Sequence, residues 1–448
     1  MISSRLDPSH LDLRVWPPTC SPALQSSSWI NARIDQDARV GRFVTATADL
    51  APGSLVLSEK QPYAKILSKE RRSTHCANCF QALPRRIPCR NRCRWRVTYC
   101  SLRCEKVHWN KLHRWLCQLD AIDRYDDTFL LAFHAYTIQR TIPNLVSHMD
   151  THWTSEVESF ASIFYLPFDA FAFILGQVRS NSFAIQSRTD DATLVKQQNL
   201  GTAVYLNASM FNHACNPNAV VMFSPESALS VRTTHSIPSG SEISISYGPL
   251  AVRQSTEQRQ LELQKKYHFQ CQCDACLSGA WDRCYKCRGC KAAVGRGNNC
   301  TACGRCMDWN KIYKLEKSLN KIDLEQALRL QQELYVDKAY EIGRTCDRIA
   351  KHYADLGLFD KAALYCEKSL EIICKHFGPS SIEAAEESFK LCTLLFNDHN
   401  IHPRRLVQQV EATINLFKRM GLDQQTPNDY QDLLNISQQS QRRAFYLA

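Results

Sequence analysis

The chain has 448 residues, of which 44% are hydrophobic and 22% are charged. This is enough material for about two to four ordinary domains, and the composition excludes wholesale disorder, collagen and a coiled-coil rod. The formal net charge is +11, a modest excess of base in a chain of this size.

The sequence contains no pattern that directs it to a membrane or to secretion. Residues 1–20 lack a basic segment followed by an apolar run, so no secretory signal is predicted. The most apolar stretch, residues 164–178, is interrupted by Pro167 and Asp169 and is too short to span a bilayer. We expect a chain of the cytoplasm and the nucleus that makes no membrane contact.

From the N-terminus, residues 1–34 read as an irregular segment rich in Pro and Ser. Strand patterns follow, with Pro52 and Gly53 as a turn, and they resume after a stretch of helical spacing at residues 120–180. The predicted strands are residues 43–47, 55–57, 219–223, 229–234 and 243–247. The sequence therefore predicts a β-rich module that is split by inserted segments.

Beyond residue 315 the strand patterns stop. Small and apolar residues at 354–357 and 361–365 match a helix-turn-helix repeat of about 34 residues, which predicts roughly three helical hairpins. The cysteines of this region are spaced singly, so we expect buried structural thiols there and not ligands. They are Cys346, Cys366, Cys374 and Cys392.

The 22 cysteines are the most unusual feature of the composition. In a reducing compartment they do not form a disulfide framework, and clustering at short separations is typical of metal coordination. Seven lie in residues 76–117 and nine in residues 271–306. Zinc is the expected metal.

The first cluster contains four ligand pairs, which suffice for two tetrahedral sites. Two of the pairs have i, i+4 spacing, which places both side chains on one helix face. Because so short a segment buries little apolar surface, we expect the metal to hold its fold together. The eight expected ligands are Cys76, Cys79, Cys89, Cys93, Cys100, Cys104, His113 and Cys117.

This cluster resembles a MYND zinc finger. The resemblance implies that pairs one and three share one ion (Cys76, Cys79, Cys100 and Cys104) and that pairs two and four share the other (Cys89, Cys93, His113 and Cys117). The Cys89/Cys93 pair is one residue wider than the usual spacing, and His108 is an alternative to His113.

The surroundings of this finger are basic. Residues 71–117 contain twelve Lys or Arg and one acid, Glu105. Part of this charge neutralises the thiolate ligands of the finger itself. The remainder is compatible either with solvated counter-charge or with a surface for nucleic acid or an acidic partner.

Several other motifs resemble those of SET-domain methyltransferases. Residues 212–218 read NHACNPN, close to the NHSCxPN motif with Ala214 in place of Ser, and residues 240–247 match the strand GEELxxxY. The remaining matches are the turn at residues 50–53, the NSF run at 181–183 and the post-SET pattern at Cys271, Cys273 and Cys276.

Together these features resemble the SET-and-MYND (SMYD) lysine methyltransferases. The implied fold is α+β multidomain: a β-rich SET domain split by a MYND finger and a helical insert, a Cys-rich post-SET segment, and an all-α TPR-like C-terminal domain. The expected boundaries are 1–34 irregular, 35–70 first SET part, 71–119 MYND, 120–180 helical insert, 181–250 SET core, 251–310 post-SET and second Cys-rich segment, and 311–448 helical domain.

The resemblance implies transfer of a methyl group from S-adenosylmethionine to a lysine of a protein substrate. Free Lys has a pKa near 10.4, and a desolvating aromatic channel lowers that pKa toward neutrality. The resemblance assigns this channel to Tyr247 and Tyr267 as the catalytic pair. It assigns cofactor binding to Gly41, Arg42, Asn181, Ser209, Asn212, His213, Tyr247 and Phe269.

Two further zinc sites are expected. The resemblance groups Cys215 with Cys271, Cys273 and Cys276, which would tie the post-SET loop to the Asn212 segment. A second set has the spacing of a small zinc ribbon, with Cys290 and Cys306 nearby as redundant candidates. Its expected ligands are Cys284, Cys287, Cys300 and Cys303.

This last segment resembles the SMYD branch that also has an N-terminal tetratricopeptide domain. No such domain precedes residue 35, so we expect either a piece of a longer protein or a shorter relative. The first alternative to an enzyme is an inactive adaptor that binds proline-containing peptides at MYND and other peptides at the helical domain. The second is nucleic-acid binding through the basic finger. We expect a monomer.

Overall fold

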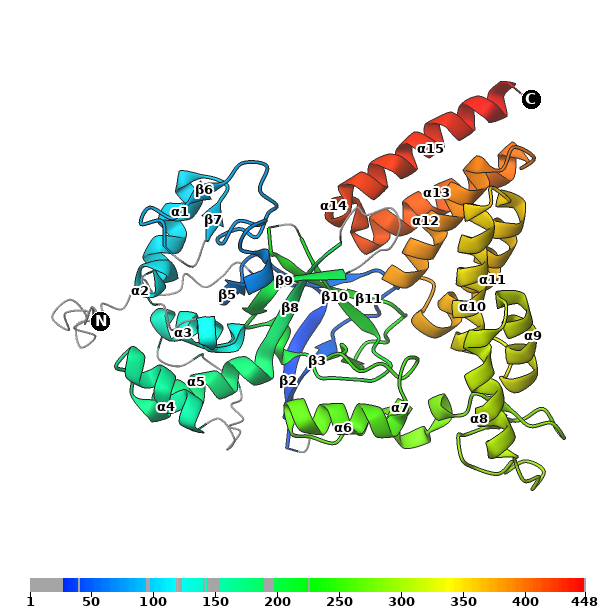
Figure 1. Ribbon diagram of the computed structural model, residues 1–448, viewed down its shortest axis with the longest axis horizontal. Helices are drawn as coiled ribbons and strands as arrows, with labels where there is room; N and C mark the ends of the chain where they lie inside the picture. The colour runs from blue at the N-terminus through cyan, green and yellow to red at the C-terminus, as the bar shows by residue number, and fades with distance from the viewer. Residues whose placement is uncertain are drawn as a thin grey trace. The chain divides into compact units, whose positions relative to one another are not determined.

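The computed structural model describes residues 27–38, 41–93, 97–117, 119, 123–139, 142, 145, 154–188, 197–224 and 226–446 (Figure 1). The chain forms two compact units. The first unit comprises residues 1–29, 57–210 and 222–230, and the second comprises residues 30–56, 211–221 and 231–448. Three of the five boundaries fall within strands, namely β4 (Leu55–Glu59), β10 (Ala219–Phe223) and β11 (Leu229–Thr233).

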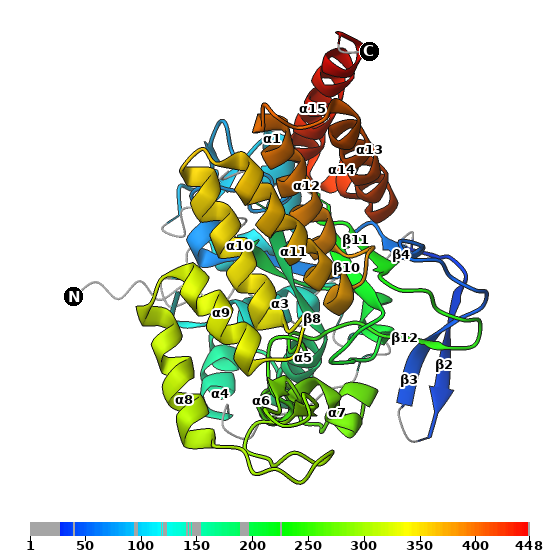
Figure 2. The ribbon, with the colours of Figure 1, turned by 90° about the vertical axis from the view of Figure 1, so that its right-hand side faces the viewer.

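The described strands form several small sheets. One four-stranded sheet has the order β1-β4-β11-β10, where β1 is Ser27–Trp29. Two three-stranded antiparallel sheets have the orders β12-β3-β2 and β5-β9-β8. Their strands are β2 (Ala32–Asp37), β3 (Gly41–Ala46), β12 (Glu242–Ile243), β5 (Ala64–Leu67), β8 (Ser182–Arg188) and β9 (Gln197–Val204). Figure 2 shows β2 and β3 as an extended hairpin.

The inserted segments of the first unit contain helices and one short strand pair, β6 (Ile87–Pro88) with β7 (Thr98–Tyr99). The cysteine-rich insert contains α1 (Leu102–His108), the π-turn Trp109–His113 and α2 (Arg114–Leu116). The second insert contains α3 (Asp127–Ile138), α4 (Thr154–Ile163) and α5 (Phe168–Asn181). These three helices bury a group of stacked and tilted rings from Phe129, Phe160 and Phe171, and such rings contribute most of the apolar burial in a small core.

The second unit carries a cysteine-rich segment, predicted as the post-SET region, and a long helical region. The cysteine-rich segment contains α6 (Thr256–Tyr267), α7 (Asp274–Ser278) and the short hairpin β13 (Tyr285–Lys286) with β14 (Ala293–Val294). The helical region runs through α8 (Trp309–Ser318), α9 (Leu324–Leu334), α10 (Tyr340–Asp355), α11 (Phe359–Phe377), α12 (Ile382–Asn397), α13 (Pro403–Met420), α14 (Leu422–Gln425) and α15 (Pro427–Tyr446). From α9 to α13 each helix packs against the next, and α10, α11 and α12 run side by side (Figures 1 and 2).

Most predicted elements are present. The strands expected at 43–47, 55–57, 219–223 and 229–234 correspond to β3, β4, β10 and β11. Residues 27–34 were expected to be irregular. Most of them instead belong to β1 and to the first half of β2, because their backbones pair with β4 and β3. Residues 1–26 lie outside the described part of the chain. The expected strand at 243–247 is reduced to Glu242–Ile243.

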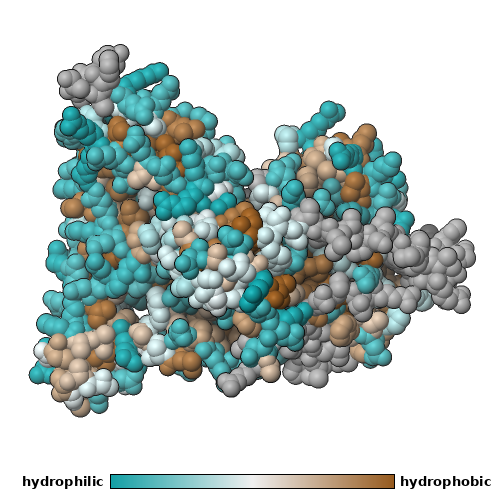
Figure 3. All heavy atoms as spheres, turned by 180° about the vertical axis from the view of Figure 1, so that it is seen from behind, coloured by the Kyte–Doolittle hydropathy of each residue, from teal (hydrophilic) through white to brown (hydrophobic). Residues whose placement is uncertain are grey.

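The helices of the C-terminal region are amphipathic, and hydrophilic side chains cover most of this region on the face shown in Figure 3. Three of its four cysteines, Cys346, Cys366 and Cys392, are buried and Cys374 is half-buried.

Among the described residues, no single helix has the length and apolar composition needed to cross a bilayer. Only α4 and α5, taken as a pair bent by 113°, meet both criteria.

Candidate functional site

Two segments far apart in sequence lie against each other in the second unit. The amide of Ala214 donates to the carbonyl of Ile245 at 2.9 Å, and the amide of Ile245 donates to the carbonyl of Asn212 at 3.0 Å. His213 and Ile245 form an isolated parallel bridge. These backbone bonds explain why the predicted strand stops at Ile243: from Ile245 onward the chain pairs with the NHACNPN segment.

His213 connects this pairing to the first cysteine of the motif. The amide of Tyr247 donates to His213 Nδ1 at 3.0 Å, and His213 Nε2 lies 3.2 Å from Cys215 Sγ. Burial lowers the pKa of His213 to about 4, so the ring is neutral. Because Nδ1 accepts a hydrogen bond, the proton is on Nε2, where it points at the Cys215 sulfur.

The two tyrosines of the sequence motifs lie together beside this histidine. Their ring centroids are 5.0 Å apart. Tyr247 Oη donates to the carbonyl of Phe211 at 2.7 Å, and Tyr267 Oη donates to the carbonyl of Tyr247 at 3.1 Å. Burial raises the pKa of Tyr247, which keeps its hydroxyl protonated. With both protons directed at carbonyl groups, each phenol oxygen presents its lone pairs to other donors.

Phe269 completes an aromatic cluster. Its ring centroid lies 6.3 Å from that of His213 and 6.5 Å from that of Tyr247. Tyr267 ends α6, and His268 then adopts a left-handed conformation with φ 62°. This turn separates the two rings along the chain while keeping both in the cluster around Cys215 and Leu263. Aromatic faces and carbonyl oxygens form surroundings that favour a cation.

Four sulfur atoms lie close together in the same part of the structure. They belong to the residues that the sequence predicted as one group, Cys215, Cys271, Cys273 and Cys276. Cys215 Sγ lies 3.9 Å from Cys271 Sγ and 3.5 Å from Cys276 Sγ. A tetrahedral zinc with Zn–S bonds near 2.3 Å places its sulfurs about 3.8 Å apart, whereas a disulfide needs about 2.0 Å. The sulfur positions fit a metal centre.

A buried arginine lies against this sulfur group. Arg259, on α6, is fully buried, and its Nη1 donates to the carbonyl of Gln254 at 2.5 Å. Its Nη2 donates to Thr256 Oγ1 at 2.8 Å and lies 3.7 Å from Cys276 Sγ. Burial disfavours the charged guanidinium, but the thiolates of Cys276 and Cys215 outweigh it and raise the pKa of Arg259. Nothing in the sequence motifs singled out this residue.

The post-SET loop is also held by a side chain of α6. Gln260 Nε2 donates to the carbonyl of Cys271 at 2.7 Å, and Gln260 Oε1 accepts from the amide of Cys271 at 2.8 Å. The amide of Ala251 donates to the carbonyl of Cys215 at 2.7 Å. The loop that carries Phe269 is therefore fixed at both sides of the sulfur group.

The first unit contains two further ligand groups, each with the members that the finger resemblance implies. In the first, Cys79 Sγ is 3.6 Å from Cys100 Sγ, and Cys100 Sγ is 3.5 Å from Cys104 Sγ, with Cys76 nearby. Their side chains are buried or half-buried. These distances match those expected around one tetrahedral ion.

The second finger group consists of Cys89, Cys93, His113 and Cys117. His113 Nε2 lies 3.2 Å from Cys89 Sγ and 3.4 Å from Cys93 Sγ. The alternative ligand, His108, instead pairs its Nδ1 with Tyr99 Oη at 2.9 Å and stacks on the His113 ring. The structure therefore groups His113 and not His108 with the three thiols.

The fourth expected group differs from the prediction in one member. The sulfurs that come together are those of Cys287, Cys290, Cys300 and Cys303. The prediction of Cys284 as a ligand is wrong, because this thiol packs against the apolar cluster of Tyr285 and Ile312. Burial raises its pKa to about 12. The sequence does contain the alternative, because Cys287 and Cys290 also form a CxxC pair, which overlaps the pair Cys284 and Cys287.

The predicted cofactor residues fall in both units. In the second, Gly41 begins β3 with φ 75°, Arg42 follows it, and Asn212 Nδ2 donates to Glu242 Oε1 at 3.0 Å. In the first, Ser209 Oγ donates to the carbonyls of Tyr205 at 2.7 Å and Asn181 at 3.2 Å. The cofactor roles of these residues stay predictions.

A buried carboxylate supports the segment that carries Ser209. Glu59 is fully buried and accepts from the amides of Asn207 at 3.2 Å and Ala208 at 3.1 Å. Burial raises its pKa to about 7, although the amide hydrogen bonds act in the opposite direction. Sequence reasoning missed Glu59 because a single acid at the end of a strand has no motif.

Residues 41–248 match the SET domain family. The SET match spans the NHACNPN segment and Tyr247, while Tyr267, Phe269 and the post-SET cysteines follow it.

Several curated proteins are similar to this chain. Protein-lysine N-methyltransferase SMYD4 of Mus musculus is 30% identical over 233 residues, which cover 45% of this chain and 29% of that protein. Histone-lysine N-methyltransferase ASHR1 of Arabidopsis thaliana is 25% identical over 395 residues, covering 73% and 78%. Histone-lysine N-methyltransferase SMYD3 of Mus musculus is 28% identical over 269 residues, covering 53% and 60%.

These similarities confirm the resemblance to the SET-and-MYND family that the sequence motifs indicated. The matched region spans less than a third of the length of the SMYD4 relatives, 29% in Mus musculus and 31% in Homo sapiens.

Proposed function

We propose that this SET-domain chain is a protein-lysine N-methyltransferase that uses S-adenosylmethionine. The observation that carries the proposal is the pair of phenols, Tyr247 and Tyr267, whose hydroxyl groups both donate hydrogen bonds to backbone carbonyls. Their oxygen atoms can therefore accept hydrogen bonds from a cationic ligand. The names of the similar proteins agree with this chemistry.

The residues present fit such a donor. S-Adenosylmethionine supplies a methyl group on a positively charged sulfonium, and aromatic rings with carbonyl oxygens favour a cation. Phe269, Asn212 and His213 are proposed to hold the cofactor, and the tyrosines to orient an incoming amine. Lowering the lysine pKa by desolvation would supply the neutral amine that transfer requires.

We further propose that zinc occupies the two finger groups and the Cys215 group. Its role at the third group is mechanical, because that group joins the Asn212 segment to the loop carrying Phe269. Peptide binding by the finger and by TPR-like helices, the monomeric state, and a cytoplasmic and nuclear location stay predictions. So does nucleic-acid binding, which predicts an affinity that falls steeply with added salt.

The adaptor alternative rests on two departures from the family pattern. Arg42 and Phe43 follow Gly41 where the family commonly has Gly-x-Gly, and Ala214 replaces Ser. At Ala214 the structural contact is made by the backbone amide, which bonds to Ile245 whatever the side chain. Loss of the Ser hydroxyl therefore leaves that pairing intact. This favours an active enzyme over an adaptor with a disrupted site.

Methyl transfer from labelled S-adenosylmethionine to proteins of a cell extract tests the proposal. Tyr247→Phe is expected to lower transfer by about 100-fold or more, the usual cost of removing one positioned donor or acceptor from an active site. Tyr285→Phe is the matched control, since it removes a hydroxyl that bonds Glu316 in the helical region. Calorimetry with S-adenosylmethionine separates the alternatives: an absence of both binding and transfer in the unaltered chain favours the adaptor.

A further inference from the structure

The fourth cysteine group lies outside the proposed methyl-transfer chemistry. Its members stand in two CxxC pairs, Cys287/Cys290 and Cys300/Cys303, on either side of β14. We propose that these four thiolates bind a structural zinc ion, which fixes the post-SET hairpin onto the helical region. The proposal concerns the stability of this segment and does not depend on the enzyme activity.

The positions of the sulfur atoms point to a metal. Cys287 Sγ lies 3.7 Å from Cys303 Sγ, and Cys290 Sγ lies 3.5 Å from Cys300 Sγ. All four sulfurs lie within 4.8 Å of one another. Each of these two distances joins a sulfur of one CxxC pair to a sulfur of the other pair. Each distance is far longer than a disulfide bond but close to the edge of a ZnS4 tetrahedron, about 3.8 Å.

The backbone of the two pairs supports the same conclusion, because both form the same turn. The amide of Cys287 donates to the carbonyl of Ala292, and the amide of Lys291 donates back to the carbonyl of Cys287, each at 2.9 Å. Lys291 has a left-handed φ of 65°. An amide hydrogen bond from Gly289 to Cys287 Sγ, at 3.4 Å, stabilises the thiolate.

The second pair repeats this pattern at the same offsets. The amide of Cys300 donates to the carbonyl of Arg305 at 3.0 Å, the amide of Gly304 donates to the carbonyl of Cys300 at 2.9 Å, and Gly304 has φ 70°. The first finger pair also repeats it. There, Cys76 bonds to Gln81 and Phe80 bonds to Cys76, each at 2.9 Å, and Phe80 has φ 68°. One turn thus recurs at three CxxC pairs.

Apolar burial alone does not account for the order of this segment. Apart from ligand cysteines, Val294 is the buried hydrophobic residue of the small cluster formed by the hairpin. Burying one Val stabilises far less than the conformational entropy lost in ordering the residues between Cys287 and Cys303. A structural zinc contributes several times as much as one buried Val side chain. A metal would therefore supply stabilisation that the apolar cluster lacks.

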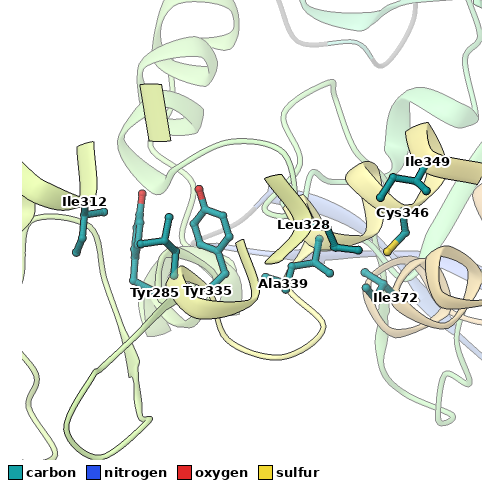
Figure 4. Close-up of a cluster of buried hydrophobic side chains, with 10 residues drawn as sticks. Tyr285, Ile312, Leu328, Tyr335, Ala339, Cys346, Ile349 and Ile372 are labelled. Carbon is teal, nitrogen blue, oxygen red and sulfur yellow. The ribbon is translucent and has the colours of Figure 1, made fainter. Parts of the chain in front are cut away.

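The ordered hairpin has a clear attachment to the helices. Tyr285 packs among Ile312, Leu328 and Tyr335 in a buried cluster (Figure 4), and its ring lies 4.9 Å from that of Trp309. Glu316 on α8 accepts from Tyr285 Oη at 2.7 Å and from Arg296 Nη2 at 3.0 Å. Since Arg296 lies between the two CxxC pairs, the metal would fix this ion pair as well.

Metal stoichiometry of purified variants tests the ligand set. We expect four zinc ions per unaltered chain, one for each ligand group. Cys290→Ser is expected to lose one ion, whereas the matched variants Cys284→Ser and Cys306→Ser keep all of them. Three ions in the unaltered chain, no loss in Cys290→Ser, or an equal loss in Cys284→Ser would each overturn the proposal.

A second measurement covers the case in which Cys290→Ser does not fold. Cys290, Cys303 and Cys306 are all exposed. In the unaltered protein a thiol-alkylating reagent is expected to modify Cys306 at least 10-fold faster than Cys290 and Cys303, and a chelator is expected to remove this difference and to speed proteolysis within residues 288–306. Equal rates before chelation, or a disulfide between Cys287 and Cys303 in the protein as purified, would contradict a zinc site.

Discussion

The amide of Tyr247 donates a 3.0 Å hydrogen bond to Nδ1 of His213. This bond fixes the proton of the imidazole on Nε2, which lies 3.2 Å from Cys215 Sγ. One side chain thus connects the backbone of a proposed catalytic tyrosine to a proposed zinc ligand. The two contacts are separable by mutation because they use different ring nitrogens.

We predict that His213→Ala is more damaging than His213→Asn. Alanine leaves the Tyr247 amide without its acceptor, at a cost of about 1–3 kcal/mol, and removes the donor to the Cys215 sulfur. Asn retains an acceptor near the position of Nδ1, but the shorter side chain has no donor at the position of Nε2. Both variants are expected to release zinc faster, whereas only His213→Ala should also increase hydrogen exchange at the Tyr247 amide. Equal exchange in the two variants would show that the hydrogen bond is unimportant.

Arg259 is predicted to be essential for the Cys215 metal group. Four thiolates and one Zn²⁺ carry a net charge of −2, and the buried guanidinium lies 3.7 Å from Cys276 Sγ. Removing one partner of a buried charge pair costs about 3–5 kcal/mol. Arg259→Met is therefore expected to lower the melting temperature and to release one zinc per chain on mild chelation.

The lysine variant separates charge from geometry. Arg259→Lys keeps the positive charge but loses the fork that reaches both Gln254 and Thr256. We expect a stability between those of Arg259→Met and the unaltered protein. A melting temperature for Arg259→Met equal to that of the unaltered chain would refute the role of Arg259 as counter-charge.

Glu59 is predicted to make stability depend on pH near neutrality. Its pKa rises from the ordinary 4.5 to about 7 in the folded chain. A raised pKa means that the protonated carboxyl is favoured in the folded state, so its contribution is fully present below pH 4.5 and is lost as pH rises through 7. Over this window the loss amounts to about 3 kcal/mol.

The test compares denaturant unfolding of the unaltered chain and Glu59→Gln at pH values from 5.5 to 8. Gln keeps an acceptor for the amides of Asn207 and Ala208 but does not titrate. The difference in stability between the two proteins should shift in favour of Glu59→Gln as pH rises. A difference that is constant across this range would mean that Glu59 is not the titrating group.

The success of the sequence predictions follows from how local each feature is. The cysteine pairs and the tyrosine motifs can be recognised because each is a short spacing in the sequence, and three of the groups that could hold a metal have the expected members. The prediction of the fourth group differs at one member, because Cys284, Cys287 and Cys290 form two overlapping CxxC pairs. Spacing does not choose between them; the left-handed turn at Lys291 and the burial of Tyr285 do.

Arg259 and Glu59 were not found because each is a single charged residue in an ordinary helix or strand. Their importance arises from complete burial, which depends on tertiary contacts with Cys276 and with the amide of Ala208. Likewise, the strand expected to reach residue 247 was shortened because Ile245 pairs with the Asn212 segment. Local propensity does not contain this information.

Because α10 and α11 pack closely, the effect of one substitution on stability is predicted to change sign with the neighbouring residue. Gly343 on α10 is buried, and a Cβ atom placed there would lie 2.8 Å from Cγ2 of Ile372 on α11. Replacing a helical Gly by Ala ordinarily stabilises by about 1 kcal/mol, but overpacking a core costs about 1–3 kcal/mol. Ile372 is 4% exposed and branched at Cβ, so it has little room to yield.

Gly343→Ala is therefore expected to destabilise the α10–α11 pair by up to about 2 kcal/mol. Ile372→Ala removes the clashing atom and by itself costs about 2–5 kcal/mol through the cavity that it leaves. In that background the same Gly343→Ala change should stabilise by up to about 1 kcal/mol, because the helix preference remains and the shortest contact is removed, which leaves the Cβ of residue 372 at 3.2 Å. Hydrogen exchange of the α10 and α11 amides measures all four proteins locally. If Gly343→Ala changes the stability in the same direction in both backgrounds, then Ile372 is not the reason that this position requires glycine.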